Sequence, residues 1–69
     1  MRLRNIPLLV RALGNPDPYV REYAADRLGD LRGESKEAIP ALRKLLETEE
    51  NSRVRREARN SLREIERAE

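Results

Sequence analysis

Apolar side chains recur every three or four residues along four stretches of the chain, and polar or charged side chains fill the positions between them. This spacing gathers the apolar side chains on one face of an α-helix. It predicts no strand and four helices, over residues 5–13, 18–31, 36–47 and 53–67. The residues expected in the core are Leu9, Leu13, Val20, Ala24, Leu28, Leu42, Leu46, Val54, Ala58 and Leu62.

Residues typical of helix ends stand near the predicted boundaries. Asp17 is a suitable N-cap, because its carboxylate can accept hydrogen bonds from free amides of the first turn. Pro18 suits the first helical position, where the missing N–H costs nothing. Gly29 and Gly33 fit the end of the second helix. Ser35 is expected to cap the third helix.

An internal repeat divides the chain. Ile6-Pro7-Leu8-Leu9 recurs as Ile39-Pro40-Ala41-Leu42. Val20-Arg21 recurs as Val54-Arg55, and the separation between these two copies is one residue longer than that between the first two. The extra residue falls in the polar stretch 47–53, where a surface loop tolerates an insertion. A period of roughly 20–50 residues, as found here, indicates stacked supersecondary units.

Each unit is predicted to be a helical hairpin, and such hairpins stack on one another. We therefore expect one all-α domain over residues 1–69, a two-repeat α-α superhelix with four helices. Repeat one covers about 5–33 and repeat two about 35–67. The run from Leu13 to Gly29 resembles the HEAT repeat, and it is most similar to the short HEAT-like repeats of phycobilisome lyases and related proteins.

The resemblance also implies a ladder of side chains between neighbouring repeats. In HEAT repeats the arginine after the valine often pairs with an acidic residue of the loop between the two helices. The corresponding arginines here are Arg21 and Arg55. The acidic position matches Asn15 in the first repeat, which departs from the family pattern, and loosely Thr48 or Glu49 in the second.

The amino-acid composition excludes several kinds of bond and functional site. The 69 residues include no cysteine and no histidine, so neither a disulfide nor a Cys or His zinc site can form. The commonest general base is also missing. The acidic group Glu47, Glu49 and Glu50 lacks the alternating oxygen ligands and central glycine of a calcium-binding loop. We expect a protein that is not an enzyme and that needs no cofactor or metal.

Charge and hydropathy indicate a folded protein outside the membrane. Charged residues make up 41% of the chain, but the net charge is only +2. No apolar run reaches the ~20 residues needed to span a bilayer. The apolar part of the N-terminus is too short for a signal peptide. A cytoplasmic location is the expectation.

Two groups of residues are candidates for binding a partner. The first group is two tyrosines and two of the acids of the second helix, and the second group is a stripe of arginines on the last helix: Tyr19, Glu22, Tyr23, Asp26, Arg56, Arg59, Arg63 and Arg67. Tyrosine is enriched at interface hot spots, but it also covers core edges while its hydroxyl reaches water. An arginine stripe can bind phosphates or simply face solvent. Because the second helix does not continue the stripe, a protein partner fits better than nucleic acid.

These observations predict an interaction or scaffold module. One alternative is a nucleic-acid-binding HEAT-like protein that uses the arginine stripe, and another is an accessory subunit of a pigment lyase-like complex. Two repeats also leave apolar end faces, which commonly mark interaction sites. We therefore expect self-association, with a closed homodimer as the simplest form.

Overall fold

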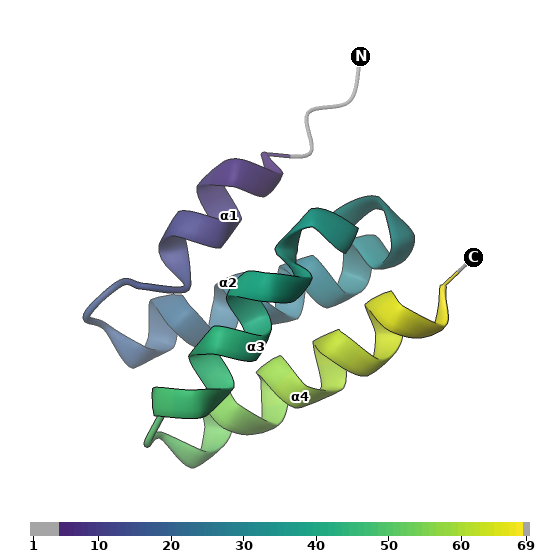
Figure 1. Ribbon diagram of the computed structural model, residues 1–69. Helices are drawn as coiled ribbons and strands as arrows, with labels where there is room; N and C mark the ends of the chain where they lie inside the picture. The colour runs from purple at the N-terminus through teal and green to yellow at the C-terminus, as the bar shows by residue number, and fades with distance from the viewer. Residues whose placement is uncertain (1–4, 69) are drawn as a thin grey trace.

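The computed structural model describes residues 5–68, and within that range the chain is helical with no strand. Figure 1 shows the order of its elements, which are α1 (Ile6–Ala12), α2 (Pro18–Leu31), the 3₁₀ helix η1 (Arg32–Ala38), α3 (Ile39–Thr48) and α4 (Ser52–Arg67). The all-α class expected from the hydrophobic pattern is therefore confirmed.

The expectation of four separate helices is wrong, because the described chain forms three continuous helical segments. α2 passes directly into η1 and then into α3, so residues 18–48 run without an open loop. The third predicted helix begins at Ile39 and not at residue 36, because residues 32–38 are wound as a 3₁₀ helix. Within η1, Ser35 departs from helical geometry, with φ −107° and ψ 29°.

The end of α2 is built differently from the prediction. Neither Gly29 nor Gly33 has a positive φ; the residue that does is Arg32, with φ 51° and ψ −127°. The Ser35 hydroxyl lies 2.6 Å from the carbonyl oxygen of Leu28 and 3.0 Å from that of Arg32. The Ser35 hydroxyl therefore serves the carbonyl of Leu28 in the last turn of α2 and does not cap α3.

The starts of the two long helices follow the expected chemistry. Asp17 caps α2 by accepting from the amide of Tyr19 at 2.9 Å, and Pro18 is the first residue of the helix. Asn51 caps α4, since its side-chain oxygen accepts from the amides of Arg53 and Val54 at 2.9 and 3.1 Å. These caps set where α2 and α4 begin, and so which side chains share a face.

The core agrees with the predicted positions in part. Six of the ten expected residues are buried, namely Leu13, Ala24, Leu28, Leu42, Val54 and Ala58. The other four are only half-buried, namely Leu9, Val20, Leu46 and Leu62. The fully buried face of α4 is centred on Val54, Ala58, Ser61 and Ile65, because α4 packs on α2 as well as on α3. Leu62 therefore lies at the flank of this contact.

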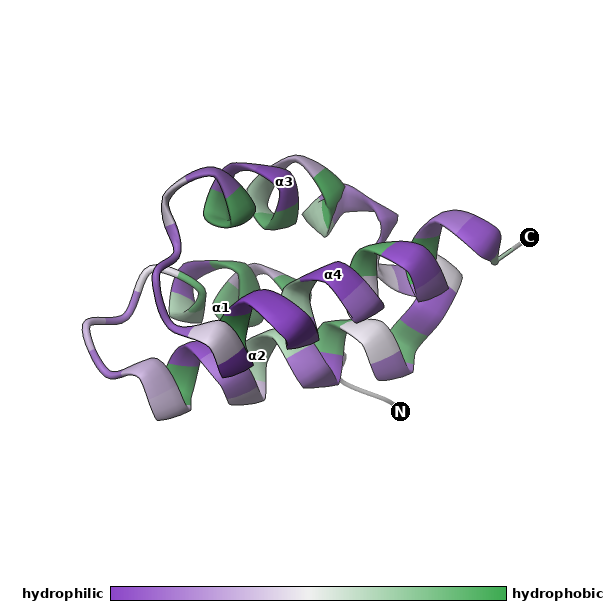
Figure 2. Ribbon diagram, turned by 90° about the horizontal axis from the view of Figure 1, so that it is seen from below, coloured by the Kyte–Doolittle hydropathy of each residue, from purple (hydrophilic) through white to green (hydrophobic). Residues whose placement is uncertain are grey.

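Helices α2 and α4 lie side by side and run in the same direction (Figures 1 and 2). They make the most extensive contact between any two elements of the described chain. Tyr19 lies beside Arg53, and Ala25 lies beside Ser61, so nearly equivalent positions of the two repeats are in contact. Hydrophilic residues line much of both helices in Figure 2. The surface formed by α2 and α4 is therefore where the candidate binding residues must be sought.

Candidate functional site

Arg21 donates four hydrogen bonds, and two of them connect the two repeats. Its Nε donates to Oε1 of Glu49 at 2.8 Å, and its Nη2 donates to Oε2 at 2.9 Å. Its Nη1 donates to the carbonyl oxygens of Asn15 and Pro16 at 2.8 and 2.9 Å. The planar guanidinium thus binds the carboxylate in a bidentate manner and also holds the turn before α2.

This ion pair is largely shielded from solvent. The Glu49 side chain is only 3% exposed and that of Arg21 19% exposed. Hydrogen bonding to Arg21 lowers the pKa of Glu49, burial opposes this, and the amide of Asn51 adds a hydrogen bond that lowers the pKa further. Hydrogen bonding to Glu49 likewise raises the pKa of Arg21 against the effect of burial. Both groups therefore stay charged inside the contact between repeats.

The ladder expected from the family pattern has one rung in the described chain. Arg21 pairs with Glu49, whereas Thr48 is exposed. The side chain of Asn15 instead accepts from the amide of Asp17 at 2.8 Å. Arg55 is exposed and makes no ion pair with any residue that the structure describes. The rung is a structural connection between the repeats.

The four candidates on α2 are brought together beside α4. Tyr19 and Tyr23 are 68% and 61% exposed, unusually open for large apolar side chains. A hollow of about 410 Å³ is lined by Tyr19, Glu22, Tyr23, Asp26 and Glu57. Two rings and three carboxylates therefore share one concave surface.

An arginine of α4 already occupies one side of this surface. The guanidinium carbon of Arg53 lies 5.6 Å from the centre of the Tyr19 ring, within the range of a cation–π contact. Its Nε lies 3.7 Å from Oε1 of Glu22. Arg53 and Glu57 were not among the residues singled out from the sequence. The repeat spacing is a signal that could have found Arg53, since Arg53 precedes Val54 as Tyr19 precedes Val20.

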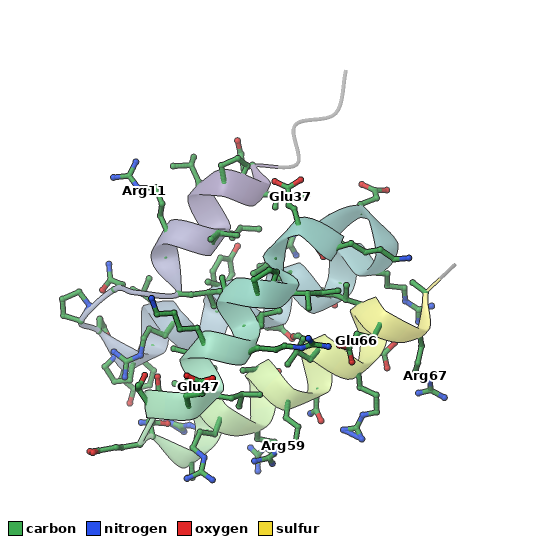
Figure 3. All side chains as sticks on the ribbon, viewed as in Figure 1. Arg11, Glu37, Glu47, Arg59, Glu66 and Arg67 are labelled. Atoms are coloured by element: carbon green, nitrogen blue, oxygen red, sulfur yellow. The ribbon has the colours of Figure 1, made fainter. Side chains whose placement is uncertain are left out.

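The arginine stripe lies on exposed positions of α4. Arg56, Arg59, Arg63 and Arg67 are all exposed, and no ion pair in the described chain involves them. Arg63 donates only to the side-chain oxygen of Asn60, at 2.8 Å. Figure 3 shows Arg59 and Arg67 projecting from the side of α4 that lies away from α3. The α4 residues beside the α2 candidates are Arg53 and Glu57, and no contact in the described chain joins the stripe to those candidates.

Acidic residues line the groove between α2 and α4. A second hollow, of about 320 Å³, has both acidic and basic side chains in its wall, and the residues that line it are Asp26, Gly29, Asp30, Arg32, Glu57, Asn60, Ser61 and Glu64. Arg32 approaches Glu64 to 3.7 Å, and both side chains remain open to solvent. The groove is therefore mainly acidic, and none of the four stripe arginines is among the residues that line it.

Comparison with known protein families decides the classification. The family model of HEAT repeats matches residues 3–63. The chain belongs to the HEAT-repeat family. The comparison with curated proteins found no match, and the comparison with solved structures found none either. The finer resemblance to phycobilisome lyases therefore has no support from these comparisons.

HEAT-repeat proteins are typically non-catalytic. Among residues 5–68 no three acidic side chains come together in a group that could hold a metal ion. Over the same residues no helix is long and apolar enough to cross a membrane. What this HEAT-repeat chain does offer is the surface of α2 and α4, with exposed rings and charges of both signs.

Proposed function

We propose that this chain is a protein-interaction or scaffold module and that its partner binds on the surface of α2 and α4. The observation that carries the proposal is the pair of exposed tyrosines beside Asp26 and Glu57, two acids that form no ion pair within residues 5–68. Tyrosine contributes a large, rigid contact area with a polar tip, and it is enriched at interface hot spots. HEAT repeats commonly mediate such contacts, which agrees with this assignment.

Charge on the same surface disfavours nucleic acid as the partner. The arginine stripe of α4 is suited to phosphates, but the neighbouring wall of the groove carries Glu22, Asp26, Asp30, Glu57 and Glu64. A phosphate backbone that crossed both helices would meet like charges on α2. No observation favours the pigment lyase-like alternative.

A pull-down with two matched baits tests the proposal. The surface variant is Tyr19→Ser with Tyr23→Ser, and the control is Glu37→Gln with Glu47→Gln, which changes exposed residues of η1 and α3 (Figure 3). Because all four side chains are exposed, both baits should keep the helical circular dichroism spectrum of the parent. We expect the parent and the control to retain the same protein, and the tyrosine variant to lose it.

The nucleic-acid alternative predicts a different result in a separate titration. Binding to duplex DNA would weaken steeply as salt is raised, because it depends on release of counterions from phosphates. Salt-dependent DNA binding lost in Arg56→Ala with Arg63→Ala, together with identical protein retention by all baits, would overturn the proposal.

A further inference from the structure

Both ends of the groove between α2 and α4 already hold an arginine of the chain itself. Near the start of α2, Arg53 stacks over the Tyr19 ring at 5.6 Å, and its Nε lies 3.7 Å from Oε1 of Glu22. At the far end, Arg32 approaches Glu64 to 3.7 Å. The chain therefore shows what this groove accepts, which is a guanidinium beside a carboxylate and, at the first end, over a tyrosine ring.

The middle of the groove has the same kinds of side chain but no arginine. Tyr23 and Asp26 follow Tyr19 and Glu22 by one helical turn, so the second ring-and-acid pair lies on nearly the same face of α2 as the first. The Tyr23 side chain is 61% exposed, and neither Asp26 nor Glu57 has an ion-pair partner among residues 5–68. All three line the hollow of about 410 Å³, and none of the residues that line it is basic. One ring and two carboxylates therefore lack the cation that the neighbouring pair has.

We propose that an arginine of a partner protein, carried on an extended basic segment, binds at this middle position. The inference rests on the proposed function and names the chemistry of the partner. The guanidinium stacks on the Tyr23 ring, as Arg53 stacks on Tyr19, and its N–H groups donate to the carboxylates of Asp26 and Glu57. Arginine suits this position better than lysine, because its planar group can stack on a ring and donate to carboxylates at the same time.

The groove is long enough for several residues of such a segment. Its two hollows share Asp26 and Glu57, so they form one continuous groove. Along α2 the residues that line it run from Tyr19 to Asp30. This stretch of helix rises by about 16 Å. An extended chain covers that length in about five residues, so the occupant is a segment of a protein and not a single amino acid.

The charge of the groove selects a cationic partner. Five acids and one arginine line the two hollows, namely Glu22, Asp26, Asp30, Glu57, Glu64 and Arg32. An acidic peptide or a nucleic acid would be repelled, and an apolar segment would bury carboxylates that have no partner. A metal ion does not fit either, since the acids among residues 5–68 form no group that could hold one.

Titration with a synthetic peptide tests the inference. The probe is a glycine–serine peptide with an arginine at every third position, and its lysine counterpart carries the same charge. Amide NMR shifts of the isotope-labelled parent report both the dissociation constant and the residues that respond. We expect the arginine peptide to bind at least about threefold more tightly than the lysine peptide, with the largest shifts around Tyr23, Asp26 and Glu57.

Two variants remove the proposed contacts, and each has a matched control. Asp26→Asn with Glu57→Gln should raise the dissociation constant of the arginine peptide at least about tenfold. Its control, Glu37→Gln with Glu47→Gln, removes the same charge from η1 and α3 and should bind like the parent, because neither residue lines the groove. Tyr23→Ser should weaken binding about three- to tenfold, whereas Tyr23→Phe keeps the ring and should bind like the parent. Circular dichroism checks that each variant keeps its helices.

Three outcomes overturn the inference: no binding of the arginine peptide to the parent, equal binding of the two peptides, or an equal loss in the groove variant and its control. Asp26→Asn with Glu57→Gln also serves as a further bait in the pull-down. If that bait retains the protein that the tyrosine bait loses, the arginine proposal fails and the proposed function stands. If all baits retain the same proteins while the peptide binds as expected, only the wider function fails.

Discussion

Glu49 is deeply buried and carries a full charge, so its contribution to the stability of the fold depends on the groups around it. Its side chain is 3% exposed and accepts two hydrogen bonds from Arg21 and one from the amide of Asn51. Replacing Glu49 with Gln removes the charge and one of the acceptor oxygens, while Arg21 remains part-buried. We expect the free energy of unfolding to fall by about 2 kcal/mol, the scale of a hydrogen bond to a charged group.

Urea denaturation followed by circular dichroism measures this change. Glu47→Gln serves as the control, because Glu47 is an exposed residue at the end of α3, close to Glu49 in the chain. A loss of the same size in both variants would show that the Arg21 contact is not what stabilises the connection between repeats.

The same carboxylate predicts how stability depends on pH. Its pKa is lower in the folded chain than the ordinary value of 4.5, because Arg21 stabilises the ionised form. The unfolded chain therefore binds the proton more readily, and stability falls as the pH drops. The contribution is complete above pH 4.5 and is lost as the pH falls through the folded-state pKa. Urea titrations between about pH 6 and pH 3 should show a steeper acid loss for the parent than for Glu49→Gln, and parallel curves would contradict this.

At the scale of the helices, Gly29 determines how closely α2 and α4 approach. A Cβ atom at this position would lie 2.6 Å from Oγ and 3.1 Å from Cα of Ser61. Because part of that obstacle is backbone, α4 would have to move. We expect Gly29→Ala to lower the free energy of unfolding by about 1–3 kcal/mol, although alanine is the better helix former.

Gly14→Ala is the matched control, since its new Cβ would meet only the carbonyl oxygen of Arg11 at 3.6 Å, an ordinary contact. Thermal melts of the two variants check the prediction. Equal melting temperatures for Gly29→Ala and the parent would mean that the two helices are not in the close contact described.

The positions of the helices could be predicted from the sequence better than the contacts that each helix makes with distant parts of the chain. The hydrophobic spacing identified both long helices and the cap at Asp17, because these depend on neighbouring residues. The resemblance to HEAT repeats pointed to Arg21 but left the acidic position open among Asn15, Thr48 and Glu49, because that choice depends on how the end of α3 meets the start of α2. The sequence also gave Gly29 the role of a helix stop, since the approach of Ser61, which is distant along the chain, leaves no local signal.

Across the whole molecule, the two repeats differ in whether another helix can pack closely against their second helix. Ala25 and Gly29 give α2 a small-residue surface against which α4 packs closely. The corresponding positions of repeat two are Arg59 and Arg63, so α4 has no equivalent surface for a further hairpin. The outward side of α4 therefore presents exposed charged residues and not a packing surface.

Both repeats also share a single core, and this predicts how the chain unfolds. Leu28 of repeat one and Ile65 of repeat two are fully buried in one cluster. Truncating either to alanine should lower the free energy of unfolding by about 2–5 kcal/mol, whereas the half-buried Leu62 should cost less. The tyrosines stand only in α2, so tyrosine fluorescence follows repeat one while circular dichroism follows every helix.

Because α4 forms its largest contact with α2, neither repeat can keep its buried face without the other. Ile65→Ala should therefore shift the tyrosine transition in urea as far as it shifts the circular dichroism transition, with the two curves coincident. A tyrosine transition that stayed in place while the circular dichroism curve moved would mean that repeat one folds alone. The core would then consist of two independent parts, and Leu28→Ala would show the opposite pattern.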